Sequence, residues 1–153
     1  MESRLSDKLN TVQRSTRSFC DRELRPIAKE IDQEGRFPWE VVDKMAALGY
    51  FGIQAPQELG GAGMDTLAYA TVIEEISRVC AAMGLCISVH NSVALFPILK
   101  FGTAEQHQRW GADLAAGKKI GAFCLTEPNA GSDAAGIEAV ARPDGESFVV
   151  NAN

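Results

Sequence analysis

The sequence predicts a mainly helical fold, a helical bundle followed by the first strands of a β structure. Up to about residue 117, apolar residues recur at intervals of three and four, the period of amphipathic helices. Glycines and prolines divide this stretch into helices of ordinary length. After residue 118 the pattern becomes that of strands. We therefore expect a helical domain over residues 1–118 and the incomplete beginning of a β-domain over residues 119–153.

The composition indicates a globular chain with a core. Of 153 residues, 46% are hydrophobic and 23% are charged, which disfavours disorder. The formal net charge is -5 and Lys and Arg form no cluster, which disfavours a nucleic-acid partner. The longest apolar run, Ala81 to Val89, ends at His90 and is far shorter than the roughly 20 residues that cross a bilayer. We therefore expect no membrane span.

The four cysteines indicate reduced thiols. They form no CxxC pair and no histidine stands at ligand spacing, so the sequence predicts no metal site. The N-terminal residues lack the apolar stretch of a signal peptide. Because free cysteine is usually buried, we expect core thiols in a reducing compartment, either the cytoplasm or the mitochondrial matrix. The cysteines are Cys20, Cys80, Cys86 and Cys124.

Two helices are expected in the first fifty residues. The first is amphipathic, and Pro26 should kink or restart it. The second runs from Trp39 to Leu48 and ends at Gly49. Trp39, like Trp110 later in the chain, is expected to pack in the core or between helices. The inward face of the first helix comprises Leu5, Leu9, Val12, Thr16 and Phe19.

A glycine-rich loop, residues 49–63, is expected to precede a third helix that Asp65 or Thr66 caps. On the polar face of this helix, Glu74 and Arg78 have the favoured i,i+4 order of an ion pair. Adjacent carboxylates on a helix point apart, so Glu74 and its neighbour Glu75 are expected to face solvent rather than share acid–base work.

Gly84 is expected to interrupt the helical pattern, and the helix that follows is apolar on nearly all sides. His90 in this helix is expected to be a buried or wall-lining histidine, because no nucleophile or orienting carboxylate pairs with it recognisably. Thr103 and Gln106 resemble a capping box that starts the last helix. Core packing, rather than substrate contact, is expected for Leu95, Phe96 and Leu99.

Two strands are expected after the last helix. One is Ile120 to Leu125 and the other lies in the terminal "SFVVNAN", with "RPDGE" as the turn between them. Two strands do not form a stable sheet in water. We therefore expect the chain to continue beyond Asn153.

The loop from Thr126 to Asp133 carries the residues of this chain that are most suited to binding a ligand. A strand end followed by a glycine-containing turn presents backbone N–H groups that suit an anionic or imide-bearing ligand. The same Pro, Asn, Gly, Ser and Asp residues are also what an ordinary turn uses. The residue types alone leave both interpretations open.

The run "GAFCLTEPNAGSDAAG", residues 121–136, closely resembles the signature of the acyl-CoA dehydrogenase family, because several linked positions match in order. The stretches "FPWEVVDKMAALGYFGIQAPQELGGAG" and "SVHNSVALFPILKFGTAEQHQRW" are similar to the early and central helices of that family. The terminal "FVVNAN" is similar to a family strand that usually has Asn-Gly, with Ala152 here in place of the Gly. The resemblance implies the N-terminal helical domain and the start of a middle β-barrel domain.

The resemblance also implies an enzyme that uses FAD to oxidise the Cα–Cβ bond of an acyl-CoA thioester. A short or branched acyl chain is expected, with an electron-transfer flavoprotein as acceptor and a homotetramer or homodimer as the assembly. By the motif, Phe123, Leu125 and Thr126 contact the flavin ring. Gly131 and Ser132 approach the cofactor's phosphates, and Ser132 also touches the thioester arm of the substrate.

The resemblance assigns no catalytic residue to this chain. Glu127 and Asp133 belong to the cofactor motif, whereas the family's proton-abstracting carboxylate comes from a C-terminal helical domain that has no counterpart here. We therefore expect this chain alone to have no turnover. Two alternatives stay open: a non-catalytic helical module that binds a ligand or partner, and an acyl-CoA oxidase that passes electrons to oxygen.

Overall fold

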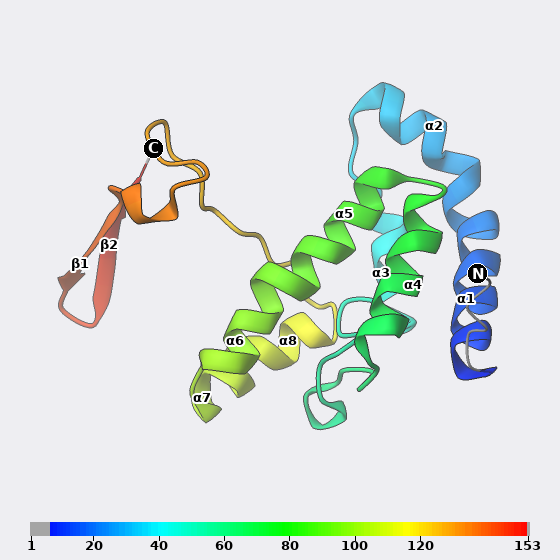
Figure 1. Cartoon of the computed structure of the whole chain (residues 1–153), viewed down its shortest axis with the longest axis horizontal. Coiled ribbons are helices and arrows are strands. Elements are labelled where there is room, and N and C mark those ends of the chain that lie inside the picture. Colours follow the sequence, from blue (N-terminus) through cyan, green and yellow to red (C-terminus); the bar gives the residue numbers. More distant parts are fainter. Residues whose placement is uncertain (1–6, 153) are drawn as a thin grey trace. The chain divides into compact units, whose positions relative to one another are not determined.

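The computed structural model describes residues 7–152, which form a set of helices followed by two antiparallel strands (Figure 1). Contacts divide the chain into two compact units, Met1–Ala122 and Phe123–Asn153. The predicted fold class is therefore confirmed. The domain boundary predicted at residue 118 stays a prediction.

The first two helices are continuous in the chain and are joined by a π-helical turn just before Pro26. Helix α1 covers Asp7–Phe19, a π-helical turn covers Cys20–Leu24, and α2 covers Arg25–Glu34. Pro26 lies in the first turn of α2, where its missing N–H costs no helical hydrogen bond. The predicted restart at Pro26 is confirmed.

Helix α3 covers Trp39–Ala47, and the glycine-rich segment after it forms turns and one short 3-10 helix, Gln57–Leu59. Helix α4 covers Thr66–Ser77. Asp65 is its N-cap, because its carboxylate accepts a hydrogen bond from the N–H of Ala68 at 2.9 Å.

A long central helix consists of α5, Ala81–Val89, a π-helical turn, His90–Leu95, and α6, Phe96–Phe101. The predicted break at Gly84 is wrong: α4 ends at Ser77 and Gly84 lies inside α5. A Cβ at Gly84 would overlap Ser77, so this glycine allows α4 and α5 to pack closely.

The central helix is long and apolar enough, at 21 residues, to cross a membrane by length and composition alone. A core helix of a globular domain passes the same test. Met83, Ile87 and Leu95 are buried within the protein, and the amide of Asn91 donates to the carbonyls of Tyr50 and Ile87. Because its buried polar groups are satisfied by the protein, we interpret it as the core helix of the bundle.

The last helical stretch comprises α7, Ala104–Gln106, a π-helical turn, His107–Gly111, and α8, Ala112–Ala115. The predicted capping box is confirmed. The hydroxyl of Thr103 accepts from the N–H of Gln106 at 3.2 Å, and the Gln106 amide oxygen accepts from the N–H of Thr103 at 2.8 Å.

The core lies where α1, α4 and α5 pack side by side (Figure 1). A smaller cluster joins the central helix to α8 through Leu95 and Leu114. Apolar burial of this kind is the main stabilising contribution of such a bundle. The largest fully buried apolar side chains are Leu24, Val41, Met45, Phe51, Ile53, Val72, Ile76, Met83, Ile87 and Leu95.

The second unit contains one β-hairpin, β1 Val140–Asp144 and β2 Ser147–Asn151, paired antiparallel with Val140 opposite Asn151. The terminal strand is confirmed. The strand predicted for Ile120 to Leu125 is wrong: that segment has no regular secondary structure, and no strand pairs with it among residues 7–152. A strand exists only through its ladder, and here β2 takes β1 as its partner.

Several burial predictions are also corrected. Trp39 and Trp110 are 63% and 42% exposed rather than packed in the core. Trp39 meets the Phe37 ring edge to face, and the guanidinium of Arg109 lies over the Trp110 ring. Cys20 is buried and Cys124 is exposed, so only part of the cysteine prediction is confirmed. Phe96 is 50% exposed, whereas Leu95 is buried as predicted.

Candidate functional site

The loop after Phe123 is built on a four-residue turn. The N–H of Glu127 donates to the carbonyl of Ala130 at 2.9 Å, and the N–H of Ala130 returns the bond at 3.1 Å. Pro128 and Asn129 occupy the two corner positions, residue types that suit a tight turn. The mutual pair of bonds gives the signature loop a defined backbone path.

Two carboxylates hold this loop in place. Glu127 accepts from the N–H groups of Glu138 and Ala139 at 2.7 and 2.9 Å, which ties the turn to the segment that leads into β1. Asp133 accepts from the N–H of Ala135 at 3.1 Å and caps a short 3-10 helix, Ala134–Gly136. Both side chains therefore have structural partners.

Gly131 and Ser132 lie on the outside of the loop with their backbone donors free. Within residues 7–152, neither N–H has a hydrogen-bond acceptor. A Cβ built on Gly131 would meet no atom within 4 Å, and the φ of Gly131 is not positive. Neither backbone conformation nor crowding inside this chain explains the glycine, whereas close approach of a ligand would.

Phe123 and Leu125 are 50% and 39% exposed, and Thr126 is also exposed. The N–H of Thr126 has no acceptor in the described part of the chain. Apolar side chains next to a free N–H and a hydroxyl suit a flat ring that has hydrogen-bonding groups at one end. Free N–H groups at Gly131 and Ser132 suit phosphate oxygens. The five predicted residues thus fit the chemistry of FAD.

A hollow of about 480 Å³ also lies in this unit, beside Pro128, Asn129 and the end of β2. None of the five predicted residues lines it. It is bordered by an open edge of the hairpin, so we interpret it as space left by the short sheet rather than as the cofactor site. Among residues 7–152 no group of three His, Cys, Asp or Glu side chains could hold a metal ion.

His90 is the residue of the helical unit that we weighed as a catalytic candidate from the sequence. Its hydrogen-bond partners could not be predicted from the sequence. It is fully buried, and its ring meets Phe51 edge to face at 4.9 Å. Its Nδ1 accepts from the N–H of Gly121 at 2.9 Å, which leaves Nε2 to donate to the carbonyl of Leu114 at 3.1 Å. Burial lowers the pKa of His90, so the ring is neutral. The prediction of a satisfied buried histidine is confirmed.

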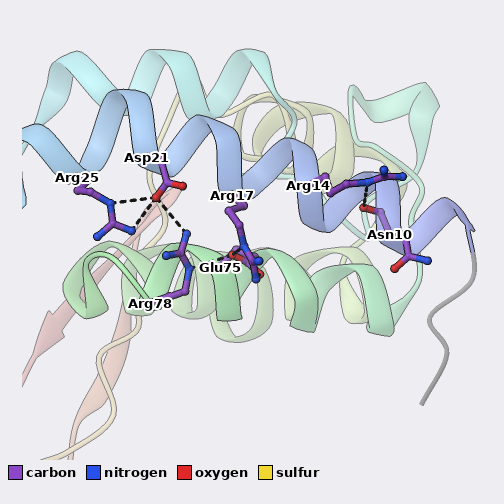
Figure 2. Close-up of polar contacts among 7 residues, drawn as sticks. All are labelled: Asn10, Arg14, Arg17, Asp21, Arg25, Glu75 and Arg78. Atoms are coloured by element: carbon purple, nitrogen blue, oxygen red, sulfur yellow. Dashed lines mark hydrogen bonds and ion pairs between the residues drawn. The ribbon is translucent and has the colours of Figure 1, made fainter. Parts of the chain in front are cut away.

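A charged network joins α1 to α4 (Figure 2). Glu75 is only 1% exposed and binds Arg17 at 2.6 Å and Arg78 at 3.1 Å. Hydrogen bonds from Arg17 lower the pKa of Glu75 against the opposing effect of burial. The predicted Glu74–Arg78 pair and the solvated Glu75 are therefore wrong: Arg78 binds Glu75 and Asp21 instead. The network serves structure, because each charge has a partner in the bundle.

Comparisons with known proteins agree with this picture. Residues 6–118 match the model of the acyl-CoA dehydrogenase N-terminal domain. The mitochondrial short-chain specific acyl-CoA dehydrogenase of Bos taurus is 50% identical over 140 residues, which are 92% of this chain and 34% of that protein. This chain therefore spans about a third of the length of the curated relatives it matches.

Solved structures show the same similarity. Butyryl-CoA dehydrogenase from Megasphaera elsdenii superposes with a TM-score of 0.90 at 32% identity, covering 99% of this chain and 40% of that one. Acyl-CoA dehydrogenase complexed with FAD from Bacillus anthracis gives a TM-score of 0.87 at 29% identity, covering 97% of this chain and 26% of that one. The chain therefore belongs to the acyl-CoA dehydrogenase family, and it corresponds to the N-terminal helical domain and the start of the β-domain.

Proposed function

We propose that this chain is the N-terminal part of an FAD-dependent dehydrogenase that oxidises the Cα–Cβ bond of a short or branched acyl-CoA thioester. The observation that supports this most directly is the signature loop. Its two carboxylates are engaged in holding the backbone, while its apolar side chains and free N–H groups face outward. That division suits a loop that binds a cofactor and does not itself transfer protons.

FAD, when bound, supplies the acceptor for the hydride that leaves Cβ. Phe123 and Leu125 lie against its ring and keep water from that face. Thr126 binds the pyrimidine end through its hydroxyl and its N–H. Gly131 and Ser132 present N–H groups to the phosphates, and the Ser132 hydroxyl also reaches the thioester arm of the substrate.

The family resemblance implies that the base that removes the α-proton lies outside residues 1–153, and the two carboxylates of the loop, Glu127 and Asp133, are already engaged by backbone N–H groups. The purified 153-residue chain is then expected to have no acyl-CoA oxidation. An electron-transfer flavoprotein is the proposed electron acceptor, and a homotetramer or homodimer the proposed assembly. The compartment is the cytoplasm or the mitochondrial matrix.

The test begins with the polypeptide as its source cells make it, identified by a peptide that spans Gly121 to Arg142. Its mass, its bound flavin and its oxidation of butyryl-CoA with an artificial electron acceptor are measured. A longer chain that carries FAD and oxidises butyryl-CoA supports the proposal. A native polypeptide of 153 residues without flavin would contradict it and favour the non-catalytic module. Rapid oxygen consumption with acyl-CoA would contradict the dehydrogenase proposal and favour an acyl-CoA oxidase.

A further inference from the structure

His90 connects three segments of the helical unit that are far apart in sequence. It starts the π-helical turn of the central helix, donates to Leu114 in α8, and accepts from Gly121 in the irregular segment that follows α8. The ring is fully buried, and the edge-to-face contact with Phe51 restricts its rotation. The bond to Leu114 is buried and the bond from Gly121 is partly buried, so both are shielded from competing water by the buried ring.

Gly121 is held against the central helix by packing as well as by this bond. A Cβ at Gly121 would lie 2.5 Å from the Cβ of Ala94, so the backbone can approach only as glycine. The compact helical unit ends at Ala122, and the next residue, Phe123, is the first of the residues proposed to contact the flavin. A residue spans at most about 3.6 Å, so Phe123 starts within about 7 Å of the residue that His90 holds.

Resting on the proposed function, we infer that His90 is a positioning residue for flavin binding: its Nδ1 fixes the chain at Gly121, the point from which the FAD-binding loop departs. A loop whose first residues are already ordered loses less conformational entropy when it closes on a ligand. The bond to Leu114 holds the ring and has no direct part in fixing Gly121.

Histidine suits this task because a neutral imidazole presents an acceptor and a donor from one rigid ring. Asparagine and glutamine each reproduce one half of it. In His90→Asn the amide oxygen takes the place of Nδ1 and can accept from Gly121, whereas the bond to Leu114 is lost. In His90→Gln the amide nitrogen takes the place of Nε2 and can donate to Leu114, whereas the bond to Gly121 is lost. The two variants are therefore matched controls for each other.

The first measurement needs no flavin. Hydrogen exchange of the Gly121 amide is compared with that of the Ile53 amide, which donates to Asn91 at 3.2 Å in the same core and corrects for general loosening. Loss of the partly buried hydrogen bond to the His90 ring predicts about a tenfold rise in the Gly121-to-Ile53 rate ratio in His90→Gln. The ratio in His90→Asn should stay within about threefold of the wild type.

The second measurement is the FAD dissociation constant of the polypeptide as its gene produces it. We expect His90→Gln to weaken FAD binding by about tenfold and His90→Asn by less than about threefold. The two variants should lower the thermal midpoint by similar amounts, because each loses one hydrogen bond of the ring. Equal FAD affinities in the two variants, or an unchanged exchange ratio in His90→Gln, would overturn the inference. If the wild-type polypeptide binds no FAD, the proposed function fails, and so does the role in flavin binding. The exchange ratio then still shows whether His90 holds Gly121.

Discussion

The helical unit and the loop-and-hairpin unit bury their side chains very differently. In the first, even charged and polar groups such as Glu75, His90 and Asn91 are buried and have hydrogen-bond partners. In the second, Ala130 is the only buried residue among those described, and every residue of β1 and β2 is exposed. The difference shows that the helical unit encloses a core of its own, whereas the loop-and-hairpin unit leaves its apolar side chains exposed.

The largest effect is expected from a cavity in the helical core. Ile76 is fully buried in α4, and Ile76→Ala should lower the free energy of unfolding by about 3 kcal/mol. Leu67→Ala, in the same helix at 62% exposure, is the matched control and should change it by less than about 0.5 kcal/mol. Urea denaturation of the 153-residue chain measures both. Equal effects would show that the helical core is not independently formed.

A smaller loss is expected when α4 and α5 are forced apart. Gly84→Ala gains helix propensity, but the new methyl group meets both the side chain and the Cα of Ser77. The crowding should prevail, for a net loss of about 1–2 kcal/mol in the free energy of unfolding. Gly84→Ala combined with Ser77→Gly should recover part of that loss, because the side chain of Ser77 is removed while its Cα, 3.1 Å from the new methyl group, remains. A more stable single variant would mean that the helices separate easily.

The charged network predicts a dependence on acid. Hydrogen bonds from Arg17 place the folded-state pKa of Glu75 below its usual value of 4.5. A lowered carboxyl pKa stabilises the fold above the unfolded value, and that contribution is lost as pH falls through the folded value. Glu75→Gln should therefore lose less stability than the wild type between neutral pH and pH values below 4.5. Glu74→Gln, at the exposed neighbour, should follow the wild-type curve of thermal midpoint against pH.

The smallest effect on stability is expected in the loop. Gly131→Ala introduces a methyl group that meets nothing within 4 Å. The free energy of unfolding, measured by thermal denaturation, should therefore change by less than about 0.5 kcal/mol. If FAD phosphates approach this backbone, the same change should weaken FAD binding by about tenfold or more, because the methyl group occupies ligand space. Unchanged stability together with unchanged FAD affinity would remove Gly131 from the proposed site.

Local signals in the sequence predicted much of the fold. Asp65 and Thr103 cap their helices as expected, because a cap is made within three residues of the chain. Pro26 restarts its helix for a similarly local reason, the missing N–H. The loop that contains the family signature was found by resemblance. The hydrogen bonds by which the Glu127 carboxylate holds the N–H groups of Glu138 and Ala139 were not predicted.

The wrong predictions concern partners distant in sequence. Arg78 had a suitable neighbour in Glu74, yet it binds Asp21, 57 residues away in the π-helical turn after α1, and Glu75, whose carboxylate also binds Arg17 of α1. The segment Ile120 to Leu125 has strand-like composition, but a strand requires a neighbour, and none pairs with it in the described residues. Trp39 was expected to be packed and is 63% exposed, since burial depends on what faces a helix.

By itself the sequence determined the helical period, the caps, the turns and the family, because each depends on residues close together in the chain or on an ordered motif. Only the tertiary structure decided that Glu75 is buried, that Gly84 is a contact between helices, and that His90 holds Gly121. Those facts depend on which surfaces pack together, and the period of a helix shows which face turns inward without showing what that face meets.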